Sequence, residues 1–293
     1  MGTENFAAFL AATGHRVVRT ELAHWYEASR GFFLSLPYHR RLSPSPADLR
    51  QVLRHWPCFG VRFPAPLEGP GKLSYQIVCD DPGYAIERLG ANSRSKVRRG
   101  LKRCEVAPLR FPDLASAGVK ANEDTLARQG RKTWLQGERW HTYCEAADRT
   151  PGVEAWGAYV GSELAAFLVT VELDDCVEFL LARSRSDFLD AYPNNALIFR
   201  VAEEMLGKRG VRKVTFGLES LEPVGPLDQF KFSMGFRAEP LRQRVVFHPV
   251  VRWVVQPPPV RAFLYRWADK RGADDVFWRK AAGLLRFAEE GGF

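Results

Sequence analysis

The sequence predicts an α/β (α+β) protein with a mixed β-sheet, and residues 154–249 carry the observations behind that prediction. Three apolar runs in this region are joined by two-residue turns, which link antiparallel neighbours. An amphipathic helix pattern then separates the third run from a fourth, as in a parallel crossover. A short helix and a last apolar run follow, so the expected sheet contains both kinds of strand pairing.

The antiparallel part consists of three expected strands, whose connections are Gly161-Ser162 and Asp174-Asp175. Loops of two residues with this composition favour tight hairpins. The strands should therefore lie side by side in chain order: residues 154–160, 163–173 and 176–183.

The crossover begins with a polar loop, 184–194, and continues as a helix over 195–208 that ends at Gly210. The apolar side chains of this helix share one side, as expected for a helix packed on a sheet: Ile198, Phe199, Val201, Ala202, Met205 and Leu206. A strand over 211–217 follows. The remaining elements of this region are a short helix and a final strand, residues 227–234 and 241–248.

The N-terminal part reads as a mixture of short helices and strands. A helix is expected over 1–13, where Phe6, Phe9 and Leu10 have helical spacing. A buried strand at 32–36 stops before Pro37, and a helix follows a Ser-Pro loop. The other expected elements are the helix 48–56, the strands 59–63 and 73–79, and two helices within 121–147.

Residues 93–104 form a strongly basic helix pattern. Val97, Leu101 and Cys104 fall on one narrow stripe, and six Lys and Arg side chains cover the rest. Two interpretations stay open. The helix could clamp the phosphates of a donor or of tRNA, with an affinity that falls as salt rises. It could equally be a solvated charged face, the commoner fate of such runs.

Composition limits the class of protein. The net charge of +8 suits an anionic partner, and 46% hydrophobic residues allow a substantial core. No apolar run approaches the ~20 residues that span a bilayer, and the start lacks a signal-peptide pattern, so a cytoplasmic protein is expected. The five cysteines form no CxxC pair and the histidines no HxxxH pair. We therefore expect buried, reduced thiols and no metal site.

The order of an antiparallel run, one parallel crossover and a final strand resembles the core of the GNAT acyltransferases. Four motifs sharpen the resemblance, and with them residues 93–249 are similar to the domain of FemABX-type peptidyltransferases and their bacterial relatives. They are the basic helix beginning Ser93-Arg94-Ser95-Lys96, the Gly-x-Tyr-Val-Gly-x-x-x-Ala-Ala hairpin at 157–166, Pro-x-x-x-Leu at 193–197, and Phe-Lys-x-x-x-Gly-Phe at 230–236.

The resemblance implies three parts and one reaction. Residues 1–92 would be a divergent GNAT-like half, 93–249 the acyltransferase domain, and 250–293 a helical tail. The reaction would be direct transfer of an acyl group from acyl-CoA to a small-molecule or peptide amine, without a metal. The alternatives are an aminoacyl-tRNA donor, as in the FemABX branch, and a non-catalytic binding module whose donor pocket has decayed. The tail could also attach to a membrane surface, although helices packed back on the domain are favoured.

The resemblance also implies the site residues. Lys231, after Phe230, matches a lysine placed at the reacting centre, where an ammonium stabilises an oxyanion; the alternative is a surface lysine. Glu178, in mid-strand, could accept the amine proton, or be salt-bridged or exposed at an edge. Tyr192 is a further catalytic candidate, and Glu219 a weaker one. The donor would be held by Asn194, Asn195, Arg94, Arg98 and Phe230. GNAT enzymes usually carry a glycine-rich loop where this chain has Tyr192-Pro193-Asn194-Asn195-Ala196.

Overall fold

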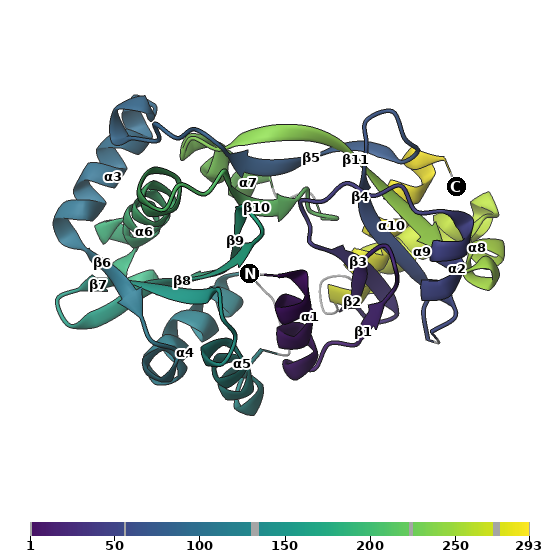
Figure 1. Cartoon of the computed structure of the whole chain (residues 1–293), viewed down its shortest axis with the longest axis horizontal. Coiled ribbons are helices and arrows are strands. Elements are labelled where there is room, and N and C mark those ends of the chain that lie inside the picture. The colour runs from purple at the N-terminus through teal and green to yellow at the C-terminus, as the bar shows by residue number, and fades with distance from the viewer. Residues whose placement is uncertain (1, 56, 130–134, 223–224, 272–275, 293) are drawn as a thin grey trace. The chain divides into compact units, whose positions relative to one another are not determined.

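The computed structural model describes residues 2–55, 57–129, 135–222, 225–271 and 276–292 (Figure 1). The chain forms two compact units, each made of separated segments. Residues 1–13, 77–217 and 225–238 make the first unit, and residues 14–76, 218–224 and 239–293 make the second. The units therefore do not follow the expected boundaries at 92/93 and 249/250. The assignment of residues 1–92 as a GNAT-like half stays a prediction.

The sheet of the first unit confirms the expected antiparallel run and the parallel crossover. Its hydrogen-bonded strand order is β5-β10-β9-β8-β7-β6. Neighbours from β6 to β9 pair antiparallel, and β10 pairs parallel to β9. The strands are β6 (Glu105–Leu109), β7 (Val153–Val160), β8 (Glu163–Leu173), β9 (Cys176–Ser184), β10 (Lys213–Leu218) and the end of β5 (Lys72–Cys79).

Helices cover both faces of this sheet (Figure 1). α6 packs on β7 and β8 with α3 beside it, whereas α4, α5 and α1 lie on the other face. The helices are α1 (Thr3–Ala12), α3 (Ala91–Arg103), α4 (Phe111–Arg128), α5 (Glu138–Asp148), α6 (Pro193–Glu203) and α7 (Gly225–Ser233). Short turns complete them: η1 (Ile86–Arg88), η2 (Ser186–Ala191) and the π-turn η3 (Glu204–Lys208), which continues α6 as the expected helix 195–208.

Large aromatic side chains fill the interior of the first unit. The rings of Trp140 and Phe167 lie 5.6 Å apart, and Phe9 of α1 meets Tyr143 of α5 at 5.3 Å. The five cysteines are free and buried, as expected. Burial raises the pKa of Cys79 to about 11, since a thiolate is poorly solvated there. These thiols are therefore packing groups rather than nucleophiles.

The second unit is also a mixed sheet with helices, in the strand order β1-β2-β3-β4-β11-β5. β3 and β4 are parallel, and β4 and β11 are antiparallel. The strands are β1 (Val17–Arg19), β2 (His24–Ser29), β3 (Phe32–Leu36), β4 (Gly60–Ala65) and β11 (Arg237–Phe247). The helices are α2 (Pro46–Leu53), α8 (Pro249–Val255), α9 (Pro258–Arg271) and α10 (Val276–Gly291).

The C-terminal segment is helical, as expected, and Pro249 starts α8 directly after β11. α10 is part of the core of the second unit: Leu284, Leu285 and Phe287 are buried in one cluster with Val245 and Phe247 of β11. This part of the tail packs back on the protein, as favoured. No described helix is both long and apolar enough to cross a bilayer.

Candidate active site

The site is built where β9 and β10 part. Their parallel pairing ends at Thr215↔Glu178, although β9 continues to Ser184 and β10 to Leu218. Gly217 has φ +80°, and a Cβ built there would meet no atom within 4 Å. Beyond the last pair, peptide groups on the facing edges have no partner in this ladder, and such groups need another acceptor or donor.

A bulge in β9 lies next to this opening. Against β8, Val169 pairs with Leu181 and Thr170 with Phe179, so Leu180 has no opposite residue. Such a bulge bends its strand, disrupts the ladder and turns side chains away from their regular direction, a feature that recurs beside active sites. The bulge at Leu180 therefore lies directly after Glu178, where the pairing of β9 with β10 ends.

Aromatic rings line the opening on one face of the sheet. The ring centroids of Phe179 and Phe216 are 5.1 Å apart, and those of Phe216 and Phe236 are 4.8 Å apart. Lys231 Nζ lies 5.4 Å from the centre of the Phe216 ring and donates to Asp228 Oδ1 at 2.8 Å. The Lys231 side chain is 22% exposed, so it is not the freely solvated surface lysine of the alternative interpretation.

The segment after Lys231 is fixed by two side chains. Tyr84 donates its hydroxyl proton to the Met234 carbonyl at 2.6 Å, and Asn195 Nδ2 lies 3.4 Å from Met234 Sδ. Asn195 belongs to the first turn of α6, so this contact joins the start of α6 to the end of α7. Phe230, half-buried, precedes Lys231 in the same helix.

No N-cap side chain occupies the backbone N–H groups at the start of α6. Its N-cap residue, Tyr192, has φ 58° and ψ 42° and provides no side-chain cap, and Pro193 has no N–H. The first N–H groups of a helix lack intrahelical partners and carry positive partial charge, which favours an anion. Asn194 is held in place by a hydrogen bond from its Nδ2 to Ser184 Oγ at 3.0 Å, which fixes this turn beside the end of β9.

The basic helix α3 lies against the same loop. The Arg99 guanidinium stands 4.6 Å over the Tyr192 ring, and Arg103 Nη1 donates to the Asp190 carbonyl at 2.8 Å. Gly100 permits this approach, since a Cβ there would lie 2.7 Å from the Tyr192 carbonyl oxygen. The structure therefore brings Arg99 and Arg103 to the start of α6.

The two arginines named from the sequence lie elsewhere on α3. Arg94 donates to the Glu87 carbonyl at 3.2 Å, and Arg98 lies 3.7 Å from the Glu87 carboxylate. Helical spacing separates the two sets, because residues 99 and 103 share a side with Gly100 and residues 94 and 98 share another. Glycine inside a basic helix was the signal that would have pointed to the packed side.

Glu178 is buried on the opposite face of the sheet. It neighbours Phe179 in β9, so alternation directs its side chain away from the aromatic rings and Lys231. The residue is 2% exposed, and neither carboxylate oxygen has a hydrogen-bond partner. Burial raises the pKa of this carboxyl well above its usual value, so the neutral acid is favoured. It is thus neither salt-bridged nor exposed, the two alternatives considered from the sequence.

Asp228 and Tyr84 were not recognised from the sequence, although Asp228 has the i,i+3 helical spacing to Lys231 that brings such charges together.

Glu219 lies in the second unit, where its carboxylate accepts a hydrogen bond from Ser74 and lies 3.7 Å from Lys72. Among the described residues, no three His, Cys, Asp or Glu side chains gather as a metal site would require.

Comparison with known proteins agrees with the GNAT-like resemblance. Residues 91–230, just under half of the chain, match the family model described as an acetyltransferase (GNAT) domain. No curated protein matches the chain in sequence at a significant level.

Solved structures share the fold at low sequence identity. FemX aligns with a TM-score of 0.61 at 10% identity, over 86% of this chain and 93% of its own. The C-terminal domain of a putative lysylphosphatidylglycerol synthetase from Agrobacterium fabrum aligns with a TM-score of 0.57 at 12% identity, over 87% and 91%. L-PGS from Bacillus licheniformis gives 0.57 at 12% identity, over 90% and 91%.

Proposed function

Residues 91–230 form an acyltransferase domain of the GNAT type, related in fold to FemX. On this premise we propose that the chain transfers an acyl group from acyl-coenzyme A to an amine and forms an amide. The amine nitrogen attacks the thioester carbonyl carbon, the carbon–sulfur bond breaks, and the proton that the amine loses ends on the released thiol.

The observation that carries this proposal is the parting of β9 and β10 after Glu178 and Thr215. An extended donor arm with amide groups can pair with the free edge of β9 as an added strand does. The bulge at Leu180 interrupts the regular ladder at that edge, where a backbone N–H can face the developing oxyanion. The rings of Phe179 and Phe216 offer an apolar wall to the acyl group.

Positive charge near the start of α6 would bind the phosphate groups of the donor. The uncapped N-terminus of α6 provides N–H groups for phosphate, and Arg99 and Arg103 lie against the loop that leads into it. Asn194 and Asn195 supply two of these backbone groups while their side chains fix the turn. Arg94 and Arg98, nearer the start of α3, add attraction over a longer range.

Lys231 is proposed as the electrostatic residue of the reaction. Its ammonium is paired with Asp228, which fixes its position, and lies beside the rings that line the opening, where a fixed charge would act on the reacting groups. It would stabilise the oxyanion or the departing thiolate. Glu178, neutral and on the other face, is not proposed as the base.

An aminoacyl-tRNA donor is the second candidate, and the loop into α6 favours it. Tyr192 occupies a place where glycine would let a pyrophosphate approach the backbone, and Arg99 covers its ring. The exposed charges of α3 would then contact the tRNA backbone, with an affinity that falls steeply with salt.

The first test is a thermal-shift titration with coenzyme A, acyl-CoAs and bulk tRNA at low and high salt. A ligand at 100 times its Kd adds ~2.7 kcal/mol to the free energy of unfolding. Stabilisation by a CoA species supports the proposal, and stabilisation by tRNA alone supports the second candidate. If neither ligand stabilises the protein, a non-catalytic binding module is favoured.

The catalytic role is tested with Lys231→Ala in a thiol-release assay with acyl-CoA and a panel of amines. Loss of one electrostatic donor should lower kcat by ~10²–10³-fold with a smaller change in KM. Lys208→Ala is the matched control, because Lys208 is an exposed helical lysine that is likewise paired with a carboxylate, that of Glu204. Equal activity of the wild type and Lys231→Ala would contradict the assignment.

A further inference from the structure

The helices α8 and α9 of the second unit carry exposed apolar side chains in regular positions. On α8, Val250, Trp253 and Val254 are 62%, 78% and 47% exposed, and their i, i+3, i+4 spacing places them on one side of the helix. On α9, Phe263 and Trp267 are 55% and 36% exposed. Large apolar groups that gather at the surface mark an interaction site.

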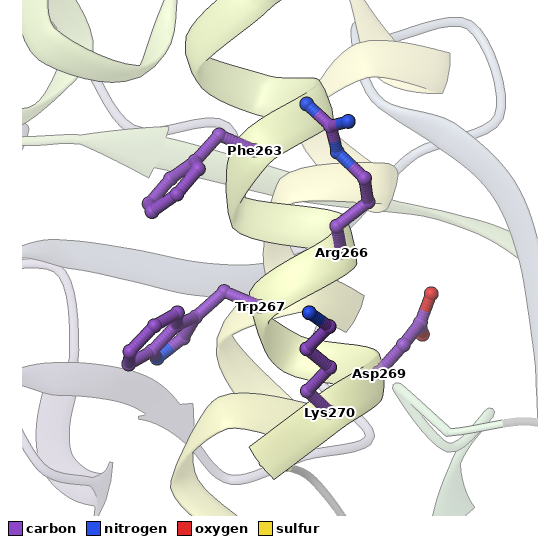
Figure 2. A pocket seen from close by; sticks show the side chains of 5 residues that line it. All are labelled: Phe263, Arg266, Trp267, Asp269 and Lys270. Atoms are coloured by element: carbon purple, nitrogen blue, oxygen red, sulfur yellow. The ribbon is translucent and has the colours of Figure 1, made fainter.

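Basic side chains are interleaved with these aromatic groups. Phe263, Arg266, Trp267 and Lys270 have the i, i+3, i+4, i+7 spacing of one helix face and line a pocket together with Asp269; Figure 2 shows these side chains along α9. The Phe263 and Trp267 rings stack at 6.0 Å, and the Arg271 guanidinium stands 5.3 Å from the Trp267 ring. The exposed charged side chains of these two helices are Arg252, Arg266, Lys270, Arg271 and the single acid Asp269.

We propose that α8 and α9 bind the surface of an anionic phospholipid membrane. Trp and Phe rings prefer the boundary between headgroups and acyl chains, while Lys and Arg extend toward the headgroup phosphates. Helices with this division lie in the plane of the interface rather than across it. α8 and α9 contribute no residue to the proposed acyl-transfer site, so the two proposals stand or fall independently.

The charge pattern selects this occupant over a second copy of the chain. A twofold contact would place the same patch against itself, and its excess of cations would then face cations. An anionic lipid surface removes that repulsion. Aromatic side chains among the cations also distinguish this face from α3, where charge predominates.

The test is co-sedimentation of the purified chain with vesicles of phosphatidylcholine alone or mixed with phosphatidylglycerol, at low and high salt. We expect binding to the anionic vesicles that weakens with salt. Trp253→Ser combined with Phe263→Ser should reduce the partition coefficient by at least about tenfold, through lost apolar burial. Arg266→Glu with Lys270→Glu should reduce it by more than about 25-fold, since each lost cation alone is worth about fivefold.

Two matched controls isolate this surface. Leu73→Ser removes a 62% exposed apolar side chain from β5, and Lys120→Glu with Arg139→Glu reverses two exposed charges on α4 and α5. Neither should change vesicle binding. Trp253→Ser alone, at the most exposed position, keeps the test available if the double variant folds poorly, as judged by circular dichroism.

Several results would overturn the proposal. These are no binding to anionic vesicles at low salt, binding that the control substitutions reduce as much as those on α8 and α9, and retention of bulk tRNA instead of vesicles through the same residues. A concentration-dependent dimer in light scattering that Trp253→Ser abolishes, without vesicle binding, would assign the face to a second copy.

Discussion

Replacing Glu178 with Gln should stabilise the protein, and the gain should grow with pH. The carboxyl is buried, both its oxygens lack partners, and burial raises its pKa well above the usual 4.5. Above pH ~4.5 the unfolded chain has released this proton while the folded chain retains it, so the free energy of unfolding falls by up to ~1.4 kcal/mol per pH unit. That loss continues until the pH passes the raised folded pKa. Gln has nearly the same shape and no proton to lose.

Urea unfolding at a series of pH values between about pH 5 and pH 8 measures this difference. The two proteins should have similar stability at the acid end and should diverge as the pH rises. Glu123→Gln is the control, because Glu123 is an exposed residue of α4 and its replacement should leave the pH dependence unchanged. A constant difference between Glu178→Gln and wild type at every pH would show that folding does not shift the pKa of Glu178, and a Gln variant that is less stable at neutral pH would show that the folded protein stabilises the carboxylate; either result would refute the reasoning.

Two further predictions concern packing and capping. Gly100→Ala should lose ~1–3 kcal/mol in urea unfolding despite the better helix propensity of alanine, because its Cβ would lie 2.7 Å from the Tyr192 carbonyl oxygen; Gly207→Ala, with no atom within 4 Å, should lose nothing. Ser45→Ala should lose ~1 kcal/mol by breaking the capping box with Asp48 at the start of α2, and an unchanged melting temperature would contradict that role.

The parts of the fold that were predictable are those with strong local signals. The hairpin turns and apolar runs between 153 and 184 define β7, β8 and β9 without tertiary information. β1, β2 and β6 were not predicted; β1 and β6 have only three and five residues, and β6 contains Pro108, which is tolerated at a sheet edge. β1 pairs with β2, the next strand in the chain, whereas β6 pairs with β7, which follows only after α4 and α5.

Some features of the candidate site could also be predicted from local sequence, whereas others depend on tertiary packing. The position of Lys231 in a short helix and its i,i+3 spacing to Asp228 are readable from the sequence, but its place beside Phe216 depends on how β10 and α7 pack. The neutral state of Glu178 depends on burial under other elements, which its mid-strand position does not reveal. Which face of α3 meets the loop at Tyr192 is likewise a matter of tertiary contact through Gly100.

The interleaved composition of the two units has a consequence for biosynthesis. The second unit needs residues 14–76 and residues 239–293, so its early strands leave the ribosome long before α10 can cover them. In the first unit, Phe9 must wait for Tyr143. Contacts of such long sequence separation slow folding and leave apolar surface open in the meantime. The nascent chain is therefore a natural client for chaperones that shield strands until their late partners emerge.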